Sequence, residues 1–334
     1  MKRIAMGVLV CVSCGAWAQD WSPKALAAEA ERVSAIVTQP AVVEWLEKAK
    51  ELPEVEGQTL FVGPRVEGGF DRAVYTPSEA RKLTEEELAE FRTVTYGPER
   101  YYATNYGSPI AYATALACAA DAGMESFKFK RILDIGYGQL GQLEMLARCG
   151  AEVQGVEVDP VVHTLYRSTR LTDRVVAQGG TRGSVTLHMG EWFTDWDLRK
   201  EVGEGFDLIL ARNVLKHGYV QPEEPMEHFD PIDVGGDPET GATRLFEALR
   251  PGGIVVVYNL GGGPWRLEDG SYNAPADVRD PFGIEAWEAA GFEVLHFQAN
   301  GSQQMREVGE ALGWGTAEEL SSYNVLYTVV RRPE

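Results

Sequence analysis

The chain has 334 residues, of which 44% are hydrophobic and 24% charged, a composition typical of a globular protein with a substantial core. Its formal net charge is −19 and no basic cluster offsets it, which argues against nucleic acid as a partner because the phosphate backbone would be repelled. No segment supplies the roughly 20 uninterrupted apolar residues that a membrane-spanning helix needs.

Residues 1–18 predict a secretory signal peptide. Lys2 and Arg3 form a basic start, residues 4–13 form an apolar run, and Ala16-Trp17-Ala18 provides a small-x-small cleavage pattern. We therefore expect an exported protein, either periplasmic or secreted. The alternative is a cytoplasmic protein in which this segment is a short buried N-terminal helix.

Residues 19–100 predict a mainly helical N-terminal extension of a main domain at 101–334. The first helix is expected at Ser22-Pro23, with serine as the cap and proline in the first turn. Further elements follow in chain order: a helical pattern at 42–52, a Gly- and Pro-rich loop with short extended pieces at 53–76, and a short helix opened by a capping box at 84–87.

From residue 101 onward, the pattern changes to alternating helices and strands. Strands are expected at 131–135, 152–158, 185–189, 207–211, 253–259, 293–298 and 324–331. Helices are expected at 110–123, 161–171, 240–249 and 282–291, and a further helix follows the Gly-rich turn after the first strand and ends at 148. Strands interleaved with helices indicate an α/β fold with a mostly parallel sheet that is covered on both faces.

The segment from Ile132 to Gly141 predicts a nucleotide-type binding turn. It runs from an apolar strand into a complete GxGxxG pattern, formed by Gly136, Gly138 and Gly141, and then into a helix. Glycines let the backbone turn tightly and let a ligand approach the main chain with no side chain in the way. The alternative is that this Gly-rich turn only connects the strand to the helix and binds no ligand.

Acidic residues surround this turn in the sequence. Asp134 precedes the first glycine by two residues, and Glu157 ends the next strand 21 residues after Gly136. A carboxylate at this place can accept both hydroxyls of a ribose. Glu191 follows a later strand, where it would lie near an adenine amine.

Together these features resemble the class I, Rossmann-like S-adenosyl-L-methionine (SAM)-dependent methyltransferase family. The resemblance extends from about Arg131 to Arg332 and includes the glycine motif, the segment 155–160, the turn 249–253 and the late helix and strand at 287–297. It implies a seven-stranded, mostly parallel sheet that ends in an antiparallel hairpin, with SAM as the cofactor. It also implies the cofactor-binding residues: Asp134, Gly136, Gly138 and Gly141 at the methionine and ribose, Glu157 at the ribose and Glu191 at the adenine.

Two other classes use related turns. Dinucleotide oxidoreductases usually have an apolar residue two positions before the first glycine, whereas this chain has Asp134. Polyamine synthases carry an acid-rich site just after the fourth strand, which the segment 212–217 does not resemble. Both comparisons favour SAM.

Methyl transfer from a sulfonium requires mainly that the acceptor be positioned in line with the methyl group. A base is needed only if the acceptor must lose a proton. His217, which follows the expected fourth strand, is the candidate catalytic base, and a surface or hydrogen-bonded histidine is the alternative. Candidate substrate-binding residues are Tyr106, Asn213 and Trp265. For Tyr106 the alternative is packing between the extension and the core. Trp265 lies in a long insertion after the fifth strand, for which an ordered surface loop is the alternative.

No metal site is expected. The segment from His217 to Glu239 contains many acids and a second histidine, but their spacing matches no ligand pattern, so a solvated acidic loop is the simpler interpretation.

The sequence therefore predicts an enzyme that transfers the methyl group of SAM to a small or medium acceptor at oxygen or nitrogen. The alternative is an exported, non-catalytic binding module with the same fold, because SAM is made in the cytosol and an exported enzyme would need a supply.

Overall fold

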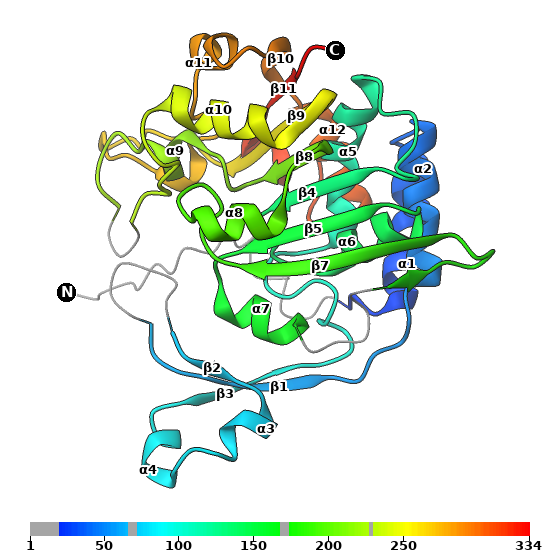
Figure 1. Cartoon of the computed structure of the whole chain (residues 1–334), viewed down its shortest axis with the longest axis vertical. Coiled ribbons are helices and arrows are strands. Elements are labelled where there is room, and N and C mark those ends of the chain that lie inside the picture. The colour runs from blue at the N-terminus through cyan, green and yellow to red at the C-terminus, as the bar shows by residue number, and fades with distance from the viewer. Residues whose placement is uncertain (1–19, 66–71, 168–173, 227–229) are drawn as a thin grey trace.

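The computed structural model describes residues 20–65, 72–167, 174–226 and 230–334. An eight-stranded sheet forms the centre, with helices on both faces, and a separate three-stranded sheet lies at the lower end in Figure 1. The predicted signal peptide lies outside the described residues. In the described part, no helix is both long and apolar enough to cross a membrane.

The central sheet has the strand order β10-β11-β9-β8-β4-β5-β7-β6. Its strands are β4 (Arg131–Ile135), β5 (Glu152–Glu157), β6 (Val175–Val176), β7 (Arg182–Met189), β8 (Phe206–Arg212), β9 (Leu249–Gly262), β10 (Glu293–Asn300) and β11 (Tyr323–Arg331). The five strands β4, β5, β7, β8 and β9 pair in parallel, whereas β11 is antiparallel to both β9 and β10. The predicted Rossmann-like fold with a C-terminal antiparallel hairpin is thus confirmed, and β6 adds a short eighth strand at the far edge.

The central strands bury apolar side chains on both faces of the sheet, because helices cover both faces. In β4, Ile132 faces one hydrophobic core, and Leu133 and Ile135 face the other. This alternation is the period-2 geometry of a strand. Parallel strands buried on both faces are expected to be largely apolar, and the buried polar residues Asp134 and Glu157 stand at or near the carboxyl ends of β4 and β5.

Two layers of helices cover the sheet (Figure 1). One layer contains α5 (Ala113–Asp121), α6 (Gly141–Arg148), α7 (Pro160–Tyr166) and α12 (Ser302–Ala311), and the other contains α8 (Trp196–Val202), α9 (His217–Val220), α10 (Pro238–Ala248) and α11 (Ile284–Ala289). Short 3₁₀ turns, at Pro109–Tyr112, Ala274–Ala276 and Glu319–Ser322, precede α5, α11 and β11. The helices α8 and α12 were not expected from the sequence.

The N-terminal extension combines helices with a small sheet. It contains α1 (Pro23–Ser34), α2 (Pro40–Glu47), a 3₁₀ turn (Lys48–Glu51), β1 (Gln58–Val62), β2 (Val74–Tyr75), α3 (Pro77–Ala80), α4 (Glu85–Leu88) and β3 (Arg92–Tyr96). Ser22 caps α1 and Thr84 forms the predicted capping box. The extended pieces pair as an antiparallel sheet, in the order β2-β1-β3, which packs against α7. Leu26 of α1 and Trp45 of α2 are fully buried in the same core as Ile132, so the extension completes the cover of the central sheet.

Candidate functional site

The glycine turn after β4 has the backbone conformation that its sequence predicts. Gly136 has a φ angle of +71° and Gly138 has one of +59°, in the left-handed region that favours glycine. A Cβ atom on Gly136 would come within 2.2 Å of Val214, and one on Gly138 within 3.0 Å of the ring of Tyr106. Both glycines are therefore required by conformation and by close neighbours. Tyr106, a predicted substrate contact, lies over the turn with 50% of its surface exposed.

The third glycine has a packing role. A Cβ atom on Gly141 would lie 2.6 Å from the side chain of Pro109, and the amide of Gly141 faces the carbonyl of Tyr102 at 3.4 Å. Gly141 thus allows α6 to begin against the segment that precedes α5. The structure places Gly141 in a helix contact, where no space is left for a ligand on its Cβ side.

Glu157 at the end of β5 is held on the glycine turn. Its Oε2 atom accepts a hydrogen bond from the amide of Gly138 at 2.9 Å, and its Oε1 atom accepts from Val158 and Asp159 at 2.8 and 3.0 Å. Burial raises the pKa of Glu157 to about 7, although the three N–H groups favour the ionised form. A carboxylate has about four lone-pair sites, so it retains capacity for a further donor.

Asp134 lies behind the turn and is fully buried. Its Oδ2 atom accepts a hydrogen bond from Nε2 of Gln142 at 3.1 Å, and its Oδ1 atom has no hydrogen-bond partner. Burial raises the pKa of Asp134 to about 7. A buried acidic oxygen without a donor is a place where a ligand N–H would be stabilising.

Glu191 and Asn213 both follow the carboxyl ends of strands in the central sheet, but their exposure and hydrogen bonding differ. Glu191 is exposed, and its Oε2 atom accepts a hydrogen bond from Thr194 at 2.9 Å. Asn213 has a φ angle of +62°, and its Oδ1 atom accepts from the amide of Leu260 at 2.6 Å. Asn213 therefore holds the end of β8 to β9, a structural role for a predicted substrate contact.

The candidate base His217 has a buried acidic partner. Its Nδ1 atom lies 2.9 Å from Oδ2 of Asp277, a residue whose side chain is only 1% exposed, whereas that of His217 is 21% exposed. The side chain of Asp277 also accepts hydrogen bonds from Tyr272 and Arg279. Burial acts to raise the pKa of Asp277, but these donors outweigh burial and hold the pKa well below its usual range. An ionised carboxylate at Nδ1 orients the imidazole and leaves Nε2 to accept a proton.

Trp265 belongs to the same cluster. The guanidinium of Arg279 lies 3.6 Å from the centre of the Trp265 ring, and it also pairs with Glu223 at 2.6 Å. Arg266 pairs with Glu223 and Glu224, so acids of the predicted acidic loop hold the insertion after β9 in place. Trp265 remains 38% exposed and can contact an acceptor with its open face.

A buried lysine directly precedes the candidate base. Lys216 has no exposed surface, and its ammonium donates to the carbonyl groups of Leu260 and Pro275 and lies 5.1 Å from the ring of Tyr219. Burial lowers the pKa of Lys216 to about 7. Neither Lys216 nor Asp277 is predictable from the sequence, because neither forms part of a recognisable local motif.

The N-terminal extension reaches the edge of the sheet that carries the glycine turn. Arg72 pairs with Asp159, the residue that caps α7 two positions after Glu157, at 2.9 and 3.1 Å. Directly after the extension, the backbone carbonyl of Tyr101 accepts a hydrogen bond from the hydroxyl of Tyr166 on α7 at 2.5 Å. The extension therefore supports the loop that holds Glu157.

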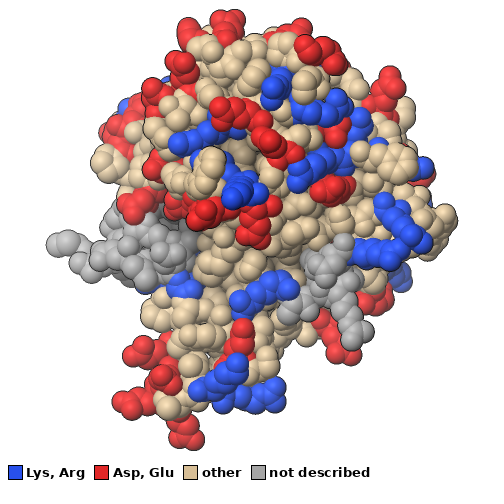
Figure 2. Space-filling view, viewed as in Figure 1, with Lys and Arg blue, Asp and Glu red and all other residues tan. Residues whose placement is uncertain are grey.

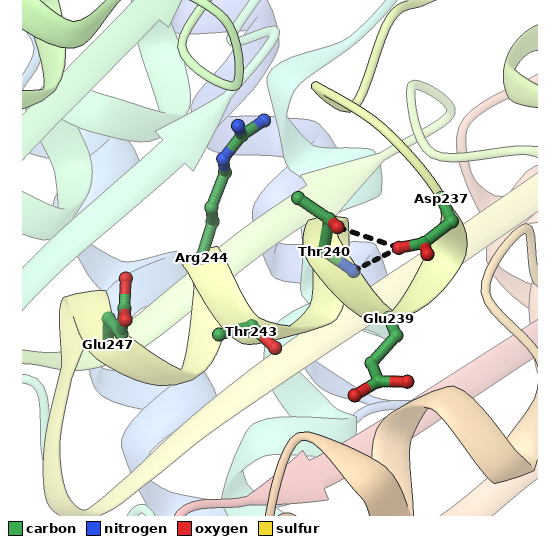
Figure 3. Close-up of a pocket in the computed structure, with 6 residues that line it drawn as sticks. All are labelled: Asp237, Glu239, Thr240, Thr243, Arg244 and Glu247. Atoms are coloured by element: carbon green, nitrogen blue, oxygen red, sulfur yellow. Dashed lines mark hydrogen bonds between the residues drawn. The ribbon is translucent and has the colours of Figure 1, made fainter.

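A hollow of about 360 Å³ lies along the outer face of α10 (Figure 3). It is lined by Asp237, Glu239, Thr240, Thr243, Arg244 and Glu247. Asp237 caps the helix through Thr240, and Arg244 donates to the carbonyl of Val234. None of the predicted site residues lines this hollow, and its own polar groups serve the helix.

Acidic and basic side chains are interspersed on the face shown in Figure 2, with no broad basic patch. Across the described part of the chain, no group of three or more His, Cys, Asp or Glu side chains is arranged to hold a metal ion. His228 of the acidic loop lies outside the described residues.

Comparisons with known proteins find similarity at the level of solved structures. No family model and no curated protein matches the chain. A phosphoethanolamine N-methyltransferase 2 from Haemonchus contortus is 16% identical, with a TM-score of 0.42, over 85% of this chain and 71% of that one. A SAM-dependent methyltransferase from Mesorhizobium loti is 17% identical, with a TM-score of 0.40, over 65% of this chain and 98% of that one. The [4+2]-cyclase SpnF is 19% identical, with a TM-score of 0.40, over 66% of this chain and 81% of that one. At these values the likeness assigns no activity to the chain.

Proposed function

We propose that the chain binds SAM at the glycine turn and transfers its methyl group to a small or medium acceptor at oxygen or nitrogen. One contact carries the proposal: the side chain of Val214 lies against Gly136. This contact joins the glycine turn to the segment that presents His217 three residues later. Ligands of open α/β sheets bind at the carboxyl ends of the strands, where both features lie.

The residues of the turn fit the chemical groups of SAM. The ammonium of the methionine part is complementary to the unpartnered Oδ1 atom of Asp134, and the ribose hydroxyls are complementary to Glu157. Tyr106 covers Gly138 and supplies an aromatic face beside the same space. When bound, SAM supplies a methyl group that is already activated by the sulfonium.

The remaining chemistry belongs to the acceptor side. His217, oriented by Asp277, is placed to take a proton from a hydroxyl or ammonium group of the acceptor. Trp265, fixed by Arg279, offers an apolar surface that excludes water and positions the acceptor. An acceptor with an aromatic or other apolar body would suit this surface.

Calorimetric titration of the protein lacking residues 1–18 with SAM, S-adenosylhomocysteine and NAD tests the proposal. We expect micromolar affinity for the two adenosyl ligands and none for NAD. Gly138→Val should abolish binding, because the side chain would meet Tyr106. Gly179→Val is the matched control, because Gly179 also has a positive φ angle but has open space around it. A folded protein that binds neither adenosyl ligand would contradict the proposal.

A further inference from the structure

Arg212 is a cation without an acid beside it. It is the last residue of β8 and is half-buried, and its Nε atom is buried with no hydrogen-bond partner. Its guanidinium lies 5.1 Å from the centre of the Tyr112 ring. Among the described residues, no carboxylate lies within ion-pair distance of Arg212, although the chain has 50 acidic residues against 31 lysines and arginines. An unmatched, partly desolvated guanidinium is costly unless an anion binds there.

An acidic side chain on the neighbouring strand, Asp134, is only partly matched: Gln142 donates to one of its oxygens, and the positive charge of Arg212 acts on it from a distance. Asp134 on β4 pairs with Leu210 on β8, and Arg212 is two positions further along that strand. The two side chains therefore share a face of the sheet as diagonal neighbours, with backbones about 7–8 Å apart. Asp134 keeps one oxygen without a donor, and no direct ion pair closes the gap.

A gap of this kind between a carboxylate and a guanidinium is complementary to a zwitterion. The ammonium and carboxylate of an α-amino acid are attached to one carbon, so one small group can contact both side chains. A planar guanidinium binds a carboxylate through two parallel hydrogen bonds, and the cation–π contact with the Tyr112 ring restricts where the guanidinium lies.

The position of the pair favours the cofactor over the acceptor as the source of this group. Asp134 accepts a hydrogen bond from Gln142 of α6, the helix that follows the glycine turn. The alternation of β8 places Arg212 on the face of Leu210, whereas α9, which begins at His217, packs Val220 into the core of the opposite face.

We propose that Arg212 binds the carboxylate of the methionine part of SAM while Asp134 binds its ammonium. This inference rests on the proposed function and assigns to Arg212 a specificity role for the amino acid part of the cofactor. It also explains why a cation follows the four apolar, buried residues 208–211 at the end of β8.

The test compares three ligands by calorimetry: S-adenosylhomocysteine, its decarboxylated form, and 5′-methylthioadenosine, which lacks the amino acid. In the unmodified protein we expect S-adenosylhomocysteine to bind at least tenfold more tightly than the decarboxylated form. Arg212→Gln should weaken S-adenosylhomocysteine by about 10- to 100-fold and leave the other two within about twofold. Arg182→Gln, at an exposed position of β7, is the matched control and should change none of the three affinities.

The outcomes separate the two proposals. Equal weakening of all three ligands by Arg212→Gln, or no weakening of any, would overturn the role of Arg212 while leaving SAM binding intact. Binding of none of the three to the unmodified protein would overturn the proposed function itself. If Arg212→Gln does not fold, equal affinity of the unmodified protein for the two forms of S-adenosylhomocysteine overturns the inference without any variant.

Discussion

The imidazole of His217 lies 2.9 Å from the carboxylate of Asp277, a residue 60 positions further along the chain. The contact joins the segment after β8 to the insertion after β9. Asp277 is buried and receives hydrogen bonds from three side chains, those of His217, Tyr272 and Arg279. It is the centre of the acceptor-side cluster, and its ionisation controls both the orientation of His217 and the stability of the insertion.

Replacing Asp277 should lower stability in a pH-dependent way. The pKa of Asp277 is held below its unfolded value of about 3.9, so its contribution is present above pH 4 and is lost as the pH falls through the folded value. We expect Asp277→Asn to lower the free energy of unfolding by about 1–3 kcal/mol at pH 7 and by less near pH 3. Urea denaturation at both pH values measures this, and a pH-independent loss would contradict the ionised role of Asp277.

Replacing His217 should separate catalysis from cofactor binding. His217→Gln keeps a polar side chain at the partly exposed position but removes the base. For acceptors that must lose a proton, we expect the rate of methyl transfer to fall by about 10²- to 10⁴-fold, with the affinity for S-adenosylhomocysteine unchanged. Single-turnover assays with a panel of phenols and amines, alongside calorimetry, measure the two effects. Unchanged transfer to an acceptor that must be deprotonated would exclude His217 as the base.

The central sheet was predictable because its signals are local. Each of the seven expected strands is an apolar or alternating run, and the glycine turn follows β4 as its pattern requires. Glu157 was identified for the same reason, since the end of β5 fixes its position. Its bonds to Val158, Asp159 and Gly138 were not predictable, because they depend on how the loop closes on itself.

The acceptor side was only partly predictable because its contacts join distant segments. His217 could be named from its position after β8, but Asp277 comes from a long insertion without periodicity. Asn213 was predicted as a substrate contact from its position just beyond the fourth expected strand, whereas its amide oxygen accepts a hydrogen bond from the backbone of β9. The three-stranded sheet of the extension was not predicted for a similar reason, because its strands are short and two of them lie within the Gly- and Pro-rich segment 53–76.

The signal peptide remains a prediction of the sequence alone. When the full chain is produced in a bacterium with an intact secretion pathway, we expect cleavage after Ala18 and recovery from the periplasm. Mass spectrometry of the purified protein locates the new N-terminus. As a control, replacing Ala16 and Ala18 by bulky residues should block cleavage. An intact N-terminus on a cytoplasmic protein would contradict export.

Asp134 should make the free protein less stable as the pH rises toward neutrality. Its folded pKa of about 7 lies above the unfolded value of about 3.9, so the folded state binds more protons between these values. The contribution of Asp134 to the free energy of unfolding is therefore fully present below about pH 4, falls as the pH rises to about 7, and changes no further above that pH. Asp134→Asn keeps the size of the side chain and cannot ionise. We compare the free energy of unfolding of Asp134→Asn with that of the unmodified protein at two pH values. This difference should be about 1–3 kcal/mol more favourable to the variant at pH 8 than at pH 4.5.

The pKa of Glu157 is also raised to about 7, so its contribution to the pH dependence of stability must be distinguished from that of Asp134. Glu157→Gln should also reduce the pH dependence, but it disturbs the hydrogen bond from the amide of Gly138 and so lowers stability at every pH. At pH 8 we therefore expect Asp134→Asn to be more stable than Glu157→Gln. Binding of S-adenosylhomocysteine provides the complementary readout, because an ammonium at Asp134 favours its ionised form and should release a proton near pH 7. Calorimetry in buffers of different ionisation enthalpy measures how many protons are released on binding. If Asp134→Asn still released the proton, the titrating group would be another residue.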